Sequence, residues 1–179
     1  MDKRSIGIFL IMKNLREFKI DSFYDRLFLQ KSIYLLQLLG VDFRFRFDWY
    51  IRGPYSKDLT AIAYGIDSRR DEYFKTSKYL KLRNDVIAVL ERLKKAINDK
   101  PSSLDDAKWL ELLSSIHYLK HISSTNPDDI KTNNIKARLE KAGKTDFDND
   151  QIESAWEKLD LLGLIKNKSL DRIPSKSNE

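Results

Sequence analysis

The chain contains no cysteine and only two histidines among its 179 residues. Without cysteine, it can form neither a disulfide framework nor a thiolate metal site. The apolar stretch Ile6–Met12 is far shorter than the roughly 20 residues that a membrane-spanning helix needs, and no signal-peptide pattern opens the chain. These absences predict a cytoplasmic protein that has no membrane partner.

The residues that are present indicate a folded, basic protein. Hydrophobic residues make up 41% of the chain and charged residues 34%, with a net charge of +6, as is typical of a globular chain that buries a core. Residues 1–100 hold 21 Lys and Arg against 13 Asp and Glu, whereas residues 101–179 hold 12 against 14. The first hundred residues are therefore expected to meet a polyanion or an acidic protein surface, although lysine-rich solubility explains the charge equally well.

Apolar residues recur at helical spacing through most of the chain. Helices are predicted over about 3–18, 22–40, 56–66, 81–98, 104–122, 127–143 and 148–165. Residues 73–80 fit a short strand or a short helix. Turn residues at Asp99–Ser103 mark a boundary, so we expect a basic N-terminal subdomain over 1–100, a helical subdomain over 101–165 and a flexible tail over 166–179.

One segment, Phe43–Ile51, changes from helical spacing to strict alternation. One face carries Phe43, Phe45, Phe47, Trp49 and Ile51. The other face carries Arg44, Arg46, Asp48 and Tyr50, and Arg52 follows on the same side. We expect a half-buried strand that ends at Gly53–Pro54, because proline cannot donate to a ladder. The predicted fold is mainly α with a small β element (α+β): a compact helical domain with a short aromatic strand or hairpin, for which a winged-helix-like arrangement is one version.

Three patterns resemble ligand sites but lack a required residue. Asp146–Glu157 has acidic residues at calcium-loop spacing, but Gln151 stands where that loop needs glycine, and Asp148 fits a helix cap equally well. His117 and His121 lie one helical turn apart without a third ligand. The AGKT stretch lacks the first glycine of a phosphate-binding loop. With no catalytic cluster either, we expect a protein that is not an enzyme and has no metal and no cofactor.

Lys31 stands within the apolar stripe of the second predicted helix. A buried ammonium must be paired or lose its charge. A structural role, as an internal ion pair with Asp48 or a snorkelling stem, is favoured over a role in a site. In Arg52–Ser56, turn-and-cap chemistry explains Gly, Pro and Ser but does not explain Tyr55; a helix start at this point could also bind an anion.

Four stretches together resemble the YwgA-like family and, more distantly, the Panacea domain of SocA-like antitoxins: LQKSIYLLQLLG, FDWYIRGPYSKDLT, WLELLSSIHYLK and IESAWEKLDLLGLI. The resemblance covers about residues 5–165. The residues that match the family motif are Leu29, Gln30, Lys31, Tyr34, Gly53, Pro54, Tyr55, Ser56 and Leu59. The resemblance implies a mostly helical domain with a small sheet, no cofactor and a binding role.

These observations predict a non-enzymatic binding module, an antitoxin-like or regulatory protein-interaction domain with a protein partner such as a toxin. The alternative is a nucleic-acid-binding, winged-helix-like transcriptional regulator, because co-facial arginines can bind phosphates. The residues expected to form the contact surface are Arg44, Arg46, Tyr50, Arg52, Tyr55, Lys57, Arg69 and Arg70. Trp109 and Trp156 lie at helical spacing with apolar residues, so we expect both in the core, where they join the C-terminal helices to the N-terminal half.

Overall fold

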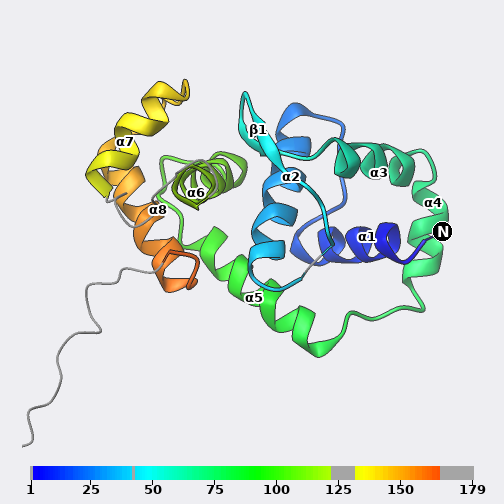
Figure 1. Cartoon of the computed structure of the whole chain (residues 1–179). Coiled ribbons are helices and arrows are strands. Elements are labelled where there is room, and N and C mark those ends of the chain that lie inside the picture. Colours follow the sequence, from blue (N-terminus) through cyan, green and yellow to red (C-terminus); the bar gives the residue numbers. More distant parts are fainter. Residues whose placement is uncertain (1, 42, 122–131, 166–179) are drawn as a thin grey trace, which may run out of the picture.

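The computed structural model describes residues 2–41, 43–121 and 132–165. These residues form eight helices and one two-stranded antiparallel sheet (Figure 1). In chain order the elements are α1 (Lys3–Leu15), α2 (Phe23–Leu38), β1 (Asp48–Tyr50), β2 (Gly53–Tyr55), α3 (Lys57–Asp67), α4 (Arg70–Ser77), α5 (Asn84–Asn98), α6 (Asp106–His121), α7 (Thr132–Lys141) and α8 (Asn149–Leu161). The expected class, mainly helical with a small β element, is confirmed.

Local capping chemistry fixes where several helices begin. Ser22 accepts from the backbone N–H of Asp25, whose carboxylate accepts from the N–H of Ser22 in return, which makes a capping box at α2. Ser56 caps α3 through the N–H of Leu59. Asp148 caps α8, which confirms the cap interpretation of its carboxylate. These starts were predicted because capping is local in sequence.

Helices α2 and α6 lie side by side at the centre of the molecule, and each packs on β2. Helix α1 packs against α3, α4 and α5, whereas α7 and α8 cover the other side of α6 (Figure 1). Trp109 on α6 is completely buried, and its indole N–H donates to the carbonyl of Ala96 on α5 at 2.8 Å. Trp156 is 5% exposed, so the predicted burial of both tryptophans is confirmed.

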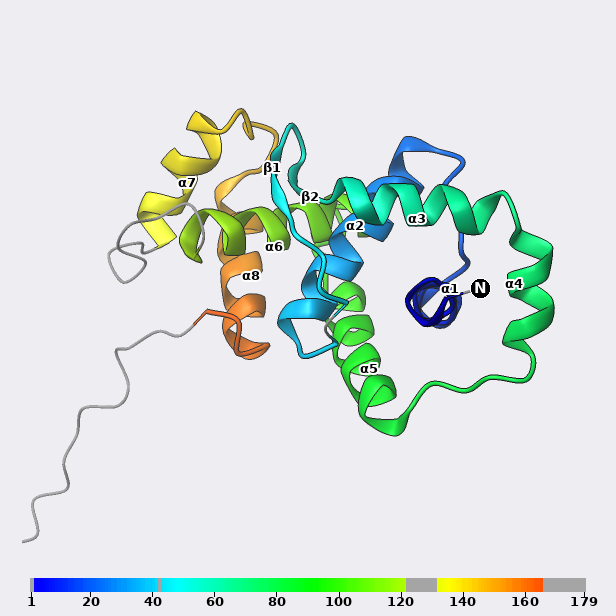
Figure 2. The ribbon, with the colours of Figure 1, turned by 45° about the vertical axis from the view of Figure 1, so that its right-hand side comes forward.

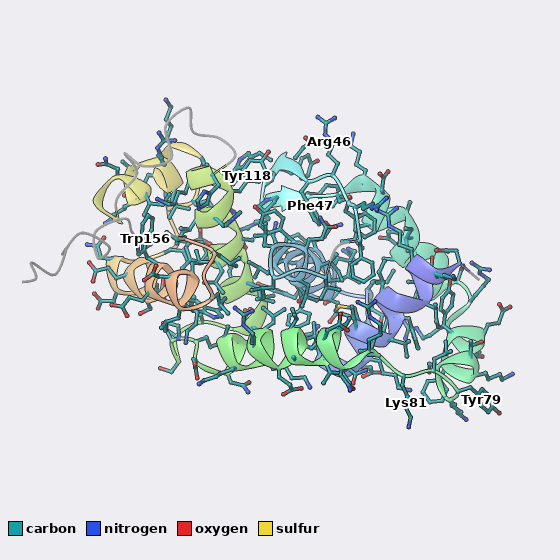
Figure 3. The ribbon with its side chains drawn as sticks, turned by 60° about the horizontal axis from the view of Figure 1, so that its bottom comes forward. Arg46, Phe47, Tyr79, Lys81, Tyr118 and Trp156 are labelled. Carbon is teal, nitrogen blue, oxygen red and sulfur yellow. The ribbon has the colours of Figure 1, made fainter. Side chains whose placement is uncertain are left out.

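The aromatic segment forms less strand than its pattern predicts. Only Asp48–Tyr50 pairs in a ladder, and residues 43–47 run beside α2 without strand pairing. Alternation of burial nevertheless holds, because the odd-numbered aromatic residues contact the core and the even-numbered residues are exposed. Figure 3 shows Phe47 pointing inward and Arg46 pointing away from the molecule. The pattern therefore correctly predicted the buried face, whereas the length of the strand was wrong.

The expectation that Gly53–Pro54 ends the strand is also wrong. Gly53–Tyr55 is a second strand, with Trp49 opposite Pro54 and Tyr50 opposite Gly53. Bonded and non-bonded pairs alternate in such a ladder, and a two-residue turn makes the Tyr50–Gly53 pair the bonded one. Pro54 then occupies a non-bonded position, so its missing N–H costs the ladder nothing.

The turn of the hairpin reverses two further expectations. Ile51, assigned to the buried face, is 73% exposed because it stands at the tip. Arg52, assigned to the solvent face, is half-buried and points toward α6. Two consecutive residues in a tight turn do not follow the pleat of the strands, so alternation fails at this point.

Other predictions concern segment ends. Residues 70–77 form the helix α4, which settles the ambiguity over 73–80. The expected boundary at 99–103 is the connection between α5 and α6, and one hydrophobic core includes residues on both sides of it. The helix start expected at Pro127 and the tail 166–179 lie outside the described residues. In the part of the chain that the structure describes, no helix combines the length and the apolarity needed to span a bilayer.

Candidate binding site at the hairpin

Gln30 joins helix α2 to the beginning of helix α3. Its side-chain amide donates to the carbonyl of Ser56 at 2.9 Å and to the Thr60 hydroxyl at 2.8 Å, and its side-chain oxygen accepts from the N–H of Ser56 at 2.9 Å. Gln30 is 4% exposed, so these bonds satisfy a polar group that would be costly to bury alone. The glutamine of the motif therefore fixes where the hairpin ends and α3 begins.

Lys31 lies completely under the hairpin. Its ammonium donates to the carbonyl of Pro54 at 2.6 Å, and the side chain is 1% exposed. Burial lowers the pKa of Lys31 to about 7, with the nearby Glu111 carboxylate acting in the opposite direction. The suggested pairing with Asp48 is wrong, because Asp48 is on the solvent face and pairs with Arg46. The expected burial of Lys31 is confirmed, and its partner is the carbonyl of Pro54.

Gly53 makes this close approach possible. Its φ is +82°, and a Cβ at this position would lie 2.5 Å from the Ser115 Oγ and 3.6 Å from the Lys31 Nζ. The left-handed conformation and the contact with α6 each disfavour a larger residue. Two separate features therefore favour glycine at this position.

A buried group of charges lies behind the hairpin turn. Glu111 on α6 is completely buried and pairs with Lys144, whose ammonium also donates to the carbonyl of Ile51 at 3.4 Å. Burial lowers the pKa of Lys144, and Glu111 opposes this shift. Arg52 lies 3.7 Å from Glu111 and 3.6 Å from Asp146. These ion pairs connect the hairpin to α6 and to the segment after α7.

Sequence reasoning did not find this group. Lys144 and Asp146 were considered only within the phosphate-loop and calcium-loop patterns. One signal was available, since Glu111 interrupts the apolar run WLELLSSI in the same way as Lys31 interrupts its own helix. Lys31 and Glu111 carry opposite charges within the apolar faces of α2 and α6, which could have suggested that these two faces pack together.

A polar contact between α2 and α6 joins Tyr34 and His117. The Tyr34 hydroxyl lies 2.8 Å from the His117 Nδ1. Burial lowers the pKa of His117 to about 3 and raises that of Tyr34, so both groups are neutral at pH 7. The described residues contain no cluster of three potential metal ligands.

A cleft of about 370 Å³ opens between α2, the hairpin and α3, and we call it the hairpin cleft. Exposed aromatic rings stand at its rim: Phe23 is 49%, Tyr50 58% and Tyr64 52% exposed. The residues that line it are Ile20, Phe23, Arg26, Leu27, Leu29, Gln30, Lys31, Tyr50, Ile51, Arg52, Gly53, Tyr55, Thr60, Ala63 and Tyr64. They include three basic residues and no acidic one.

The structure divides the predicted contact residues among three places. Tyr50, Arg52 and Tyr55 line the hairpin cleft, and the rings of Tyr50 and Tyr55 lie 5.4 Å apart. Arg46 and Lys57 border a second, shallower hollow, which Tyr50 and Tyr55 border as well. Arg44 is exposed and lies two positions before Arg46 in the chain. Arg69 and Arg70 lie at the α3–α4 turn, where Arg70 pairs with Asp67.

Compared with protein-family models, with curated proteins and with solved structures, the chain gives no significant match. The YwgA-like and Panacea-like resemblance therefore remains a prediction. Its motif residues nevertheless occupy connected positions, because Gln30 and Lys31 bond the backbone of Ser56 and Pro54.

Proposed function

We propose that this chain is a non-enzymatic protein-interaction module, antitoxin-like or regulatory, whose hairpin cleft takes an apolar side chain from a segment of its partner. The observation that carries the proposal is an apolar cleft with a rim of half-exposed aromatic rings. Exposed aromatic residues are enriched in protein interfaces, and a pocket that receives an anchor residue is the usual centre of one.

Charge indicates which segment fits. Arg26 and Arg52 stand in the lining without an acidic residue among the lining side chains. Arg52 lies 3.7 Å from the buried Glu111 and 3.6 Å from the exposed Asp146, and its guanidinium has donors left for a further acceptor. A partner segment with an aromatic or aliphatic anchor and a neighbouring carboxylate is therefore the best complement.

The rigidity of the site supports a binding role. The hairpin is held from below by Lys31, from α2 by Gln30 and from α6 by the Glu111 ion pairs. A preformed cleft loses little conformational entropy when a partner binds. The polar groups of Lys31 and Gln30 are occupied by these structural bonds, which favours recognition over catalysis.

The nucleic-acid alternative is weaker at this position. Two arginines of the expected row are already paired with carboxylates: Arg46 lies 3.3 Å from Asp48, and Arg52 lies 3.7 Å from Glu111 and 3.6 Å from Asp146. The row of co-facial arginines expected from the sequence therefore offers fewer cations to a phosphate backbone than predicted.

Co-expression with the product of a neighbouring gene tests the proposal. Ile51→Glu places a charge on the exposed rim of the cleft, and Leu161→Glu is the matched control on α8, since these side chains are 73% and 78% exposed. We expect the wild type and Leu161→Glu to co-purify with the partner and to relieve its toxicity, and Ile51→Glu to fail in both. Equal behaviour of the two variants would place the contact elsewhere.

A further inference from the structure

The end of α4 and the connection to α5 carry a second exposed surface, which does not include any residue of the hairpin cleft. Figure 2 shows this connection at the edge of the molecule opposite α7 and α8. Basic and aromatic side chains gather there, together with Lys13 from α1, and we call the group the α4–α5 surface: Lys13, Phe74, Lys75, Lys78, Tyr79 and Lys81. Tyr79 is 89% exposed, and Figure 3 shows Tyr79 and Lys81 projecting outward.

The lysines of this surface differ from Arg46 and Arg52 of the hairpin segment, which pair with carboxylates. Within the described part of the chain, none of its four lysines forms an ion pair. Lys13 instead donates to the Ser77 hydroxyl at 3.2 Å, and its ammonium lies 4.9 Å from the centre of the Phe74 ring. The Lys78 ammonium lies 5.3 Å from the same ring. A half-exposed ring is therefore flanked by two ammonium groups.

We propose that the α4–α5 surface binds single-stranded nucleic acid without strong sequence preference. Lysines neutralise phosphates, while exposed rings stack on bases, and any base offers a face for stacking. Phe74 and Tyr79 provide two such rings among the four cations. This proposal is independent of the hairpin cleft.

The exposed side chains favour a nucleic acid over a lipid surface. A membrane contact would use hydrocarbon that can enter the bilayer interface. The aliphatic side chains of Leu80 and Ile87 are each only 41% exposed, whereas Tyr79, at 89%, is the most exposed of the large apolar and aromatic side chains.

Fluorescence anisotropy with a labelled oligothymidylate of about 20 nucleotides tests the proposal across a salt series. The double variant Lys78→Gln/Lys81→Gln should reduce the slope of log affinity against log salt by roughly 1.4, because each lost phosphate contact on a single strand contributes about 0.7. The matched control, Lys95→Gln/Lys141→Gln, removes the same charge from exposed positions on α5 and α7 and should retain the wild-type slope.

Two variants of Tyr79 distinguish base stacking from simple charge attraction. Tyr79→Ala should weaken binding by about 5- to 150-fold, whereas Tyr79→Phe should bind like the wild type. Absence of wild-type binding at low salt, an equal loss in the lysine control pair or full binding by Tyr79→Ala would each overturn the proposal. So would Tyr79-dependent binding to phosphatidylserine vesicles without oligonucleotide binding. Ile51→Glu should bind the oligonucleotide normally, which keeps this test separate from that of the cleft.

Discussion

Replacing Gly53 with alanine tests the close packing under the hairpin. The alanine must keep the left-handed backbone conformation of Gly53, which costs a non-glycine residue about 1–2 kcal/mol. It also meets the Ser115 Oγ at 2.5 Å, and overpacking of a core typically costs roughly 1–3 kcal/mol more. We therefore expect Gly53→Ala to lower the free energy of unfolding by about 2–5 kcal/mol.

The chain provides a control for each contribution. Gly143 has a φ of +77° with no atom within 4 Å of an added Cβ, so Gly143→Ala should cost only the conformational part. Ser115→Ala removes the clashing oxygen, which has no hydrogen-bond partner in the described structure, and should itself be nearly neutral. In the Ser115→Ala background, Gly53→Ala should cost no more than Gly143→Ala.

Urea denaturation followed by circular dichroism measures these differences, and the double-mutant cycle isolates the coupling between Gly53 and Ser115. If Gly53→Ala and Gly143→Ala cost the same in both backgrounds, the hairpin does not press on α6 as described, and the reasoning is refuted.

Three further predictions concern buried charge and packing. Because burial lowers the pKa of Lys31 to about 7, the unfolded state binds more protons than the folded state above that pH. The unfolding free energy of the wild type, relative to that of Lys31→Met, should therefore rise by up to about 1.4 kcal/mol per pH unit from pH 7 toward 10. A difference that stays constant with pH would contradict the burial of Lys31. Trp109→Ala should lower the unfolding free energy by roughly 3–5 kcal/mol, and a wild-type melting curve would show that the indole is exposed. Arg46→Glu should change stability by less than about 0.5 kcal/mol, whereas Arg52→Glu should destabilise clearly more because it faces the buried Glu111; equal melting temperatures would refute this difference.

The sequence was informative wherever the determinants are local. The capping residues Ser22, Ser56 and Asp148 begin helices because a side chain bonds a backbone N–H three positions away. Alternation correctly assigned the faces of the aromatic segment over residues 43–50. Both signals depend on neighbours in the chain, so they can be read without knowing the tertiary structure.

The candidate site depends on distant contacts and could be predicted only in part. Glu111 and Lys144 are separated by 33 positions and meet only after α6 and α7 pack. Arg52 looked like a solvent-facing residue because the turn that redirects it was read as the end of a strand. Lys31 could be predicted to be buried, but its partner, the carbonyl of Pro54, is a backbone group that no sequence pattern shows.

The most direct test of the central claim is hydrogen exchange of the chain alone and with its protein partner, read by mass spectrometry. A partner in the hairpin cleft should slow exchange in residues 50–55 and 57–64 and in the first turns of α2, and should leave α7 and α8 unchanged. New protection confined to α7 and α8, with the hairpin unaffected, would contradict the assignment of the cleft as the binding site.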